Sequence, residues 1–301
     1  GEEFFVKGVA TNGKNNKGDG SNPFFDTARE RGANVVRSYF QINMSALDDL
    51  ARKGMYVSMG LSVSKESEGF DYNDKTARQK QINTLKRVVD KYKDHPAILM
   101  WCIGNEVEFT TKADGTPFKL NVNVWKDINE IGEYIKKVDG RPVTIALTGI
   151  NGQNIENIKK LIPSLDLICI NNYEGTVENL NNLYQAQHLS CPYILSEFGI
   201  RGTWDVGVPH TDWFTTSAKG GLIEPSGNEK AKVYKKIYRD CVLGCANKGC
   251  IGSFVFLWGW QTHGDVLNWY AMYDQFEASA LPTVDAMEEM WTGKAPENSA
   301  P

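Results

Sequence analysis

The chain has 301 residues, of which 41% are hydrophobic and 23% are charged, so it can bury a large core and is not disordered by composition. Its net charge is −4 and its Lys and Arg residues are scattered, which argues against a nucleic-acid-binding surface. No apolar run reaches membrane-spanning length, so we expect no membrane partner.

Short β-rich runs alternate along the chain with longer amphipathic stretches. Eight runs have the composition and length of strands, at residues 4–10, 34–40, 55–62, 98–105, 142–148, 166–172, 192–198 and 250–258. Apolar residues at helical spacing predict helices over 74–92, 124–138 and 228–246. Each predicted strand is followed by a helix or by a segment of helical length.

This alternation predicts the fold class. Regular βα alternation requires parallel strands covered by helices, and eight such units close a barrel. An open doubly wound sheet is the alternative, but no Gly-x-Gly-x-x-Gly follows the first strand and no phosphate loop is found. We therefore predict an α/β fold, a single (β/α)₈ TIM barrel over residues 1–301, with a long loop at about 199–227.

The six cysteines show no metal-ligand spacing, and we expect neither a metal nor a cofactor. Cys191 and Cys250 each begin a late strand, which leaves a disulfide between them open. The chain starts at Gly1 almost directly in a strand, so we expect that a leader was removed. With a glycosylation sequon at 43–45, this favours a secreted or periplasmic protein.

Two glutamates end apolar runs, Glu106 after 98–105 and Glu197 within 192–199. A carboxylate beside an apolar core is costly unless it has a partner or a function. In the predicted barrel they end strands four and seven, at the face where barrel active sites lie. Retaining glycosidases place two carboxyl groups about 5–5.5 Å apart, and inverting ones ~6.5–9.5 Å apart. The alternative for either glutamate alone is a surface or helix-capping residue.

Four segments resemble the clan A glycoside hydrolases. Residues 101–106 (WCIGNE) resemble the strand-four signature, in which Asn-Glu carries the acid/base, and 194–199 (ILSEFG) resemble the strand-seven nucleophile motif. Residues 92–98 resemble the barrel of glycoside hydrolase family 2. Residues 4–9 are similar both to that family and to the fungal β-1,3-glucanosyltransferases.

The resemblance implies roles for five residues. Glu106 would be the general acid/base and Glu197 the nucleophile. Asn105 would hydrogen-bond the sugar 2-hydroxyl. Arg37 would support Glu197 and lower its pKa, and Tyr173 would touch Glu197. We also expect the pKa of Glu106 to be raised, because the acid must hold a proton near neutral pH.

Aromatic residues extend this implied site. Trp258 would form the strand-eight platform under the sugar, because aromatic faces suit the apolar faces of pyranose rings. Trp204 lies in the long loop that we expect to wall a substrate groove, and Trp260 and His263 would extend it. Core packing remains the alternative for each of them.

We expect a retaining β-glycoside hydrolase or transglycosidase, monomeric, that acts on an oligo- or polysaccharide. A β-glucan, with β-1,3 linkage, is the first expectation. Family 2 enzymes normally carry β-sandwich domains before the barrel, which a chain of this length cannot hold, so a large exo-acting galactosidase or glucuronidase is disfavoured. The alternatives are a β-galactosidase or β-mannanase of the same clan, or a catalytically silent carbohydrate-binding barrel.

Overall fold

The computed structural model describes residues 4–11, 23–112, 114–202, 218, 222–263, 266–267 and 269–294. Eight parallel strands pair in chain order and close into a barrel, with β8 beside β1. The strands are β1 Val6–Ala10, β2 Val35–Arg37, β3 Tyr56–Leu61, β4 Ile98–Asn105, β5 Val143–Leu147, β6 Ile168–Asn171, β7 Tyr193–Phe198 and β8 Cys250–Val255. A short antiparallel pair, β9 Thr262–His263 and β10 Val266–Leu267, follows β8.

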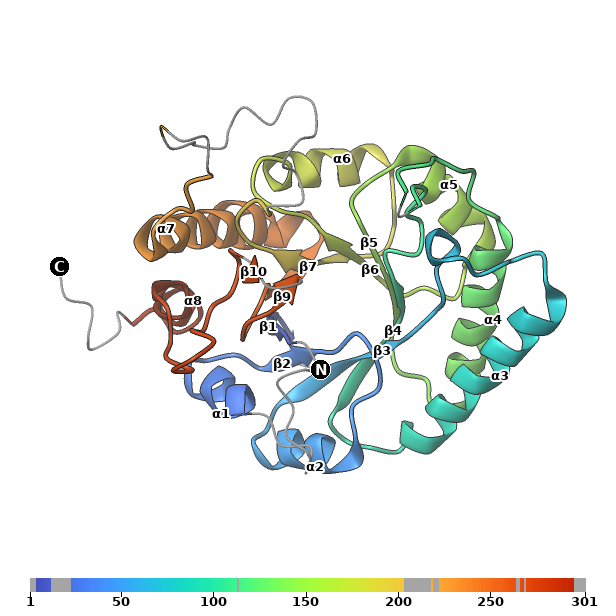
Figure 1. Ribbon diagram of the computed structural model, residues 1–301. Helices are drawn as coiled ribbons and strands as arrows, with labels where there is room; N and C mark the ends of the chain where they lie inside the picture. The colour runs from blue at the N-terminus through green and yellow to red at the C-terminus, as the bar shows by residue number, and fades with distance from the viewer. Residues whose placement is uncertain are drawn as a thin grey trace.

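Helices surround the strands (Figure 1). They are α1 Pro23–Glu30, α2 Met44–Arg52, α3 Lys75–Tyr92, α4 Asn123–Val138, α5 Gly152–Leu161, α6 Leu180–Ala186, α7 Gly227–Ile237 and α8 Pro282–Thr292. The amphipathic pattern of α4 shows why they pack there: Ile128, Ile131 and Ile135 lie on one face and are fully buried. Among the helices that the structure describes, none is long and apolar enough to cross a membrane.

The predicted barrel is confirmed, and the strand bounds agree within a few residues for most strands. Strand β2 covers only three residues of the predicted 34–40, and β8 ends at Val255 because the chain turns over the next four residues. The helix predicted over 228–246 is α-helical only to Ile237. It continues as a π-helical segment, Tyr238–Val242, and a 3₁₀ segment, Leu243–Lys248.

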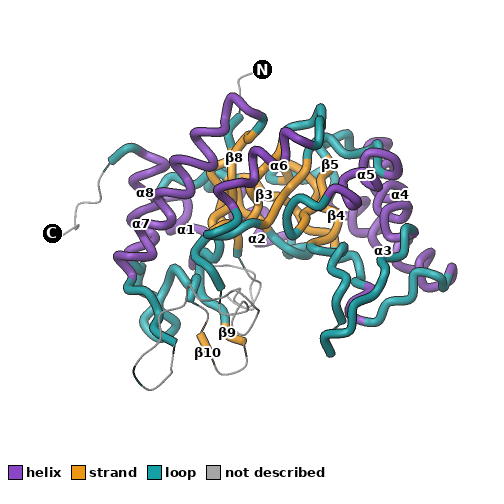
Figure 2. Tube along the Cα trace, turned by 90° about the horizontal axis from the view of Figure 1, so that it is seen from above, coloured by secondary structure: helices purple, strands orange, loops and turns teal. Residues whose placement is uncertain are grey.

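The strands bring their carboxyl ends to one face of the barrel, because all eight run in the same direction. Figure 2 shows β9, β10 and several long loops on one side of the barrel. The predicted loop at 199–227 falls mostly outside the described residues.

All six cysteines are free thiols, so the disulfide left open between Cys191 and Cys250 does not form. Cys250 is buried at the start of β8, and Cys191 lies near Tyr184, whose hydroxyl is 3.7 Å from the Cys191 sulfur.

Candidate active site

Glu106 follows β4 directly, on a backbone that is unusual for a glutamate. Its φ is 53°, in the left-handed region, and that of Gly104 is 80°. The pairing of β4 with β5 shifts register between Cys102 and Asn105, and the Glu106 amide donates to the Ala146 carbonyl at 2.8 Å. A non-glycine residue in this region costs on the order of 1–3 kcal/mol and is concentrated at functional sites. The strand end therefore positions Glu106 at an energetic cost.

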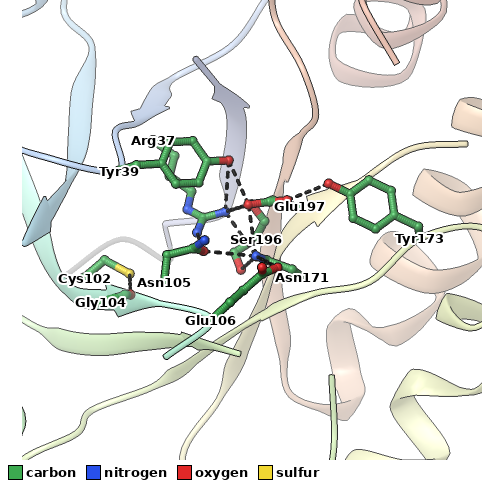
Figure 3. Close-up of polar contacts among 10 residues, drawn as sticks. All are labelled: Arg37, Tyr39, Cys102, Gly104, Asn105, Glu106, Asn171, Tyr173, Ser196 and Glu197. Carbon is green, nitrogen blue, oxygen red and sulfur yellow. Dashed lines mark hydrogen bonds and ion pairs between the residues drawn. The ribbon is translucent and has the colours of Figure 1, made fainter. Parts of the chain in front are cut away.

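Glu197, on β7, is only 6% exposed and is surrounded by donors. Its Oε1 accepts hydrogen bonds from Arg37 Nη1 at 2.9 Å, from Tyr39 hydroxyl at 2.8 Å and from Asn171 Nδ2 at 2.9 Å. Among the described residues its Oε2 accepts one, from the Tyr173 hydroxyl at 2.5 Å (Figure 3). The predicted contacts of Arg37 and Tyr173 with Glu197 are thus present, and Oε2 is the less occupied oxygen.

The pKa of Glu197 is raised above its ordinary value. Burial is the largest cause, and the charge of Arg37 opposes it while that of Glu106 adds to it. Arg37 does lower the pKa of Glu197, as expected of a nearby cation, but desolvation outweighs it. Burial likewise raises the pKa of Tyr39 and of Tyr173 well above 10, so both remain protonated donors.

Asn171, the last residue of β6, connects the two glutamates. Its Nδ2 lies 2.9 Å from Glu106 Oε1 and 2.9 Å from Glu197 Oε1. The two carboxylate oxygens are therefore separated by no more than twice that distance, which is below the ~6.5–9.5 Å separation of inverting enzymes. Arg37 and Ser196 donate to Asn171 Oδ1, at 3.1 Å and 2.8 Å, which fixes the orientation of the amide.

Hydrogen bonds also fix the orientation of the Asn105 side-chain amide. Its Oδ1 accepts from Arg37 Nη2 at 2.7 Å and from Asn171 Nδ2 at 3.0 Å. No described residue accepts a hydrogen bond from its Nδ2. That nitrogen can therefore donate to a ligand beside the glutamates, as the predicted bond to a sugar hydroxyl requires.

Trp258 is not part of this site. It is fully buried, its indole N–H donates to the Phe24 carbonyl at 3.1 Å, and its ring packs on Tyr273 and Trp291. The platform predicted for it is wrong, because β8 ends before Trp258 and the following turn directs this side chain toward α1 and α8. Trp258 anchors those helices to the barrel.

Two of the other three aromatic predictions fall on side chains that the structure does not describe. Trp204 lies outside the described residues, and His263 is described only as backbone of β9. Trp260 is half-buried and packs against the hydrophobic core.

Three residues that the sequence reasoning did not assign belong to the site: Tyr39, Asn171 and Phe256. The Phe256 ring meets Tyr173 edge to face, with centroids 6.0 Å apart and planes at 89°, and lies 4.7 Å from the Tyr270 ring. Phe256 thus lies beside Tyr173, which donates to Glu197, where the sequence analysis expected Trp258. Asn171 shares with the glutamates the signal of a polar residue at a strand's carboxyl end.

A cleft of about 340 Å³ begins beside Asn105 and Tyr39 and extends over the end of β3. Ser62, Ser64 and Lys65 also line it. In the part of the chain that the structure describes, no group of three or more His, Cys, Asp or Glu side chains is placed to hold a metal ion.

An eight-stranded parallel barrel with two close carboxylates at its carboxyl face is the architecture of retaining glycosidases. The family model for the TIM barrel domain of glycosyl hydrolases family 2 matches residues 44–219, more than half of the chain. The chain belongs to this family.

Individual proteins that resemble the chain share little of its sequence. The chain is 20% identical over 241 residues to a β-glucuronidase of Streptococcus agalactiae, an alignment that covers 71% of this chain and 38% of that protein. The β-glucuronidase of Bifidobacterium dentium superposes with a TM-score of 0.69 at 15% identity, covering 96% of this chain and 46% of the other. A family 2 β-galacturonidase of Eisenbergiella tayi gives 0.70 at 16%, covering 98% and 52%. The chain thus spans about half or less of these proteins, and the solved structures bear on the fold alone.

Proposed function

We propose that the chain cleaves β-glycosidic bonds by retaining double displacement, with Glu197 as nucleophile and Glu106 as acid/base. The observation that carries the proposal is the single Asn171 nitrogen that contacts both carboxylates. It supports a separation in the retaining range rather than one with room for a water between carboxylate and sugar.

In the first step Glu197 Oε2 attacks the anomeric carbon while Glu106 gives its proton to the glycosidic oxygen. The bond from that carbon to the departing oxygen breaks, and a covalent glycosyl ester forms. In the second step Glu106 takes a proton from water, whose oxygen displaces Glu197 and restores the β configuration. A sugar hydroxyl in place of water gives transglycosylation.

The first product anomer tests this mechanism. Proton NMR of the sugar released from an aryl β-glycoside should show the β-anomer first, with the α-anomer appearing only by mutarotation. Release of the α-anomer first would contradict retention. Absence of turnover on every β-glycoside would favour the silent carbohydrate-binding barrel.

Two classes are proposed for the glycone, the sugar whose anomeric carbon Glu197 attacks. The first is a neutral glucan: Glu197, Asn105 and Asn171 already occupy the guanidinium of the buried Arg37, so it is not available to a substrate carboxylate. The β-1,3 linkage is proposed from the sequence resemblance alone. A uronic acid is supported by the uronide-hydrolysing relatives and by Lys65, which lines the cleft beside Asn105.

A panel of 4-nitrophenyl β-glucoside, β-galactoside, β-mannoside and β-glucuronide, together with a β-1,3-linked glucan oligosaccharide, separates these classes. If the glycone is a uronic acid, Lys65→Met should lower kcat/KM for the glucuronide more than for the neutral glycosides. Lys75→Met, on the exposed start of α3, is the control. Secretion and the monomeric state remain predictions.

A further inference from the structure

A second hollow lies between the loop after β4 and the start of α5, outside the cluster that surrounds Glu197. It has a volume of about 590 Å³, within the ~300–1,000 Å³ range of small-molecule sites. The loop after β4 forms one wall, with Glu108 and Phe109, and Thr148 with the first turns of α5 forms the other, with Asn151 and Asn154.

Glu108 is the buried polar group of this cavity and is 5% exposed. Its Oε1 accepts two hydrogen bonds from Thr148, from the amide at 2.5 Å and from the hydroxyl at 3.0 Å. Its Oε2 is buried and has no partner among the described residues. A buried carboxyl oxygen without a partner is costly, so a ligand hydroxyl that reaches it would be bound favourably.

Burial also raises the pKa of Glu108, and the charge of Glu106 adds to the shift. This carboxyl therefore keeps its proton to a higher pH than an ordinary glutamate. In the protonated form it can donate a hydrogen bond as well as accept one.

The remaining lining suits a sugar ring. Asn151 uses its Oδ1 to cap α5, accepting from the amides of Gln153 and Asn154, so its amide nitrogen can donate to a ligand. Phe109 is 51% exposed and supplies an apolar ring. Amide donors opposite an aromatic face match the hydroxyl edge and the C–H face of a pyranose.

The wall that carries Phe109 is held by backbone hydrogen bonds. The amide of Phe118 donates to the Thr110 carbonyl at 2.9 Å, and that of Lys112 to the Thr116 carbonyl at 3.0 Å. Thr111 and Pro117 form an antiparallel bridge in the same loop. The cavity is thus a formed feature of the β4–α4 loop.

The position of Glu106, the proposed general acid, determines what can occupy this cavity. A general acid protonates the departing oxygen, so the departing group must lie beside Glu106. Glu108 is two residues farther along the same loop, and Thr148 follows β5, the strand paired with β4. We infer that the cavity walled by Glu108, Phe109 and Thr148 is the leaving-group subsite and binds a neutral sugar ring there. This inference rests on the proposed function.

The test compares two substrates that share the glycone turned over by the wild type, a β-linked disaccharide and the corresponding glycosyl fluoride. Fluoride needs no sugar in the leaving-group subsite. We expect Glu108→Gln and Phe109→Ala each to lower the ratio of kcat/KM for disaccharide to that for fluoride about tenfold, the scale of one lost buried contact. Phe276→Ala, at a phenylalanine that is 86% exposed in the loop before α8, is the control and should leave the ratio unchanged.

The two proposals fail in different ways. An unchanged ratio in both variants, with the fluoride still turned over, would overturn the subsite and leave the proposed function intact. Wild-type protein inactive on both substrates would overturn both. Phe109 is half exposed, so its variant decides the question even where Glu108→Gln, which alters a buried group, does not fold.

Discussion

The ends of β4 and β7 carry the same side chain in opposite surroundings. Glu197 is buried and accepts four hydrogen bonds, from Arg37, Tyr39, Asn171 and Tyr173. Glu106 is half-buried and accepts one described hydrogen bond, from Asn171. Its backbone is in the left-handed region, whereas Glu197 lies within the strand β7.

This difference matches the two roles in double displacement. A nucleophile must be ionised and held at a fixed angle to the anomeric carbon; the donors around Glu197 fix its angle and oppose the rise in its pKa that burial causes. An acid/base loses and regains a proton in each turnover and must reach a leaving group outside the protein. A residue with few internal partners suits that task. The variants below test whether the two strand ends are as different in function as in surroundings.

The largest effect is expected for Glu197→Gln. The amide keeps the shape of the side chain but cannot form the glycosyl ester. We expect kcat on an activated aryl β-glycoside to fall by on the order of 10⁴ or more, as for loss of a covalent nucleophile. Glu277→Gln, an exposed glutamate, should retain full activity in the same assay. Turnover by Glu197→Gln near the wild-type rate would exclude Glu197 as nucleophile.

For Glu106→Gln the loss should depend on the leaving group. A poor leaving group needs the proton, so kcat/KM should fall about 10²–10⁴-fold with an alkyl β-glycoside. A dinitrophenyl β-glycoside departs without protonation, so its kcat/KM should change far less. Equal losses with both substrates would show that Glu106 acts on position or stability instead.

A smaller loss is expected for Tyr173→Phe, which removes the one donor to Glu197 Oε2 among the residues that the structure describes. A hydrogen bond to a charged group contributes about 1.5–3 kcal/mol, so kcat/KM should fall roughly ten- to hundredfold. Tyr193→Phe is the matched control, because Tyr193 begins the same strand that carries Glu197. A Tyr173→Phe enzyme as active as that control would show that Oε2 needs no internal donor.

The two glutamates were predictable from the sequence because each ends a continuous apolar run. Such runs mark buried parallel strands, and a charged residue at their end is unusual enough to identify the site. Counting βα units then placed both residues at one face. The comparisons support the family 2 part of the resemblance on which the residue roles were based.

Trp258 shows where this reasoning fails. Its assignment assumed that β8 extends to residue 258, but β8 ends at Val255 and Phe256 lies beside Tyr173 instead. Strand ends are set by the turn that follows and by packing against other elements, here α1 and α8, which a single strand's pattern does not contain. An error of two residues exchanged the aromatic beside Tyr173 for one that packs against α1 and α8.

Tyr39 and Asn171 were missed for a different reason. Tyr39 gives no signal of this kind, and Asn171 ends its strand without a charge; the importance of both comes from convergence with residues on other strands. The left-handed backbone of Glu106 is equally hidden, because glutamate has no preference for that region. This backbone follows directly on the register shift between β4 and β5.

The smallest expected effect is a change in thermal stability with pH. It tests whether burial or hydrogen bonding dominates the pKa of Glu197. Because burial raises the pKa of Glu197 above its ordinary value near 4.5, the folded protein binds this proton more tightly than the unfolded chain. The resulting stabilisation is present below the unfolded pKa and is lost as pH rises through the folded pKa. Glu197→Gln removes that loss, so the Tm of the variant minus that of the wild type should increase as pH rises across this window.

Asp274→Asn provides a control of opposite sign. Hydrogen bonds from the amides of Glu277 and Phe276 lower the pKa of Asp274, so its contribution is present above its unfolded pKa and is lost as pH falls. The Tm difference for Asp274→Asn should therefore become more negative as pH rises. If the difference for Glu197→Gln followed that same course, the four donors would outweigh burial, and Glu197 would be held ionised at a stabilising rather than a destabilising site.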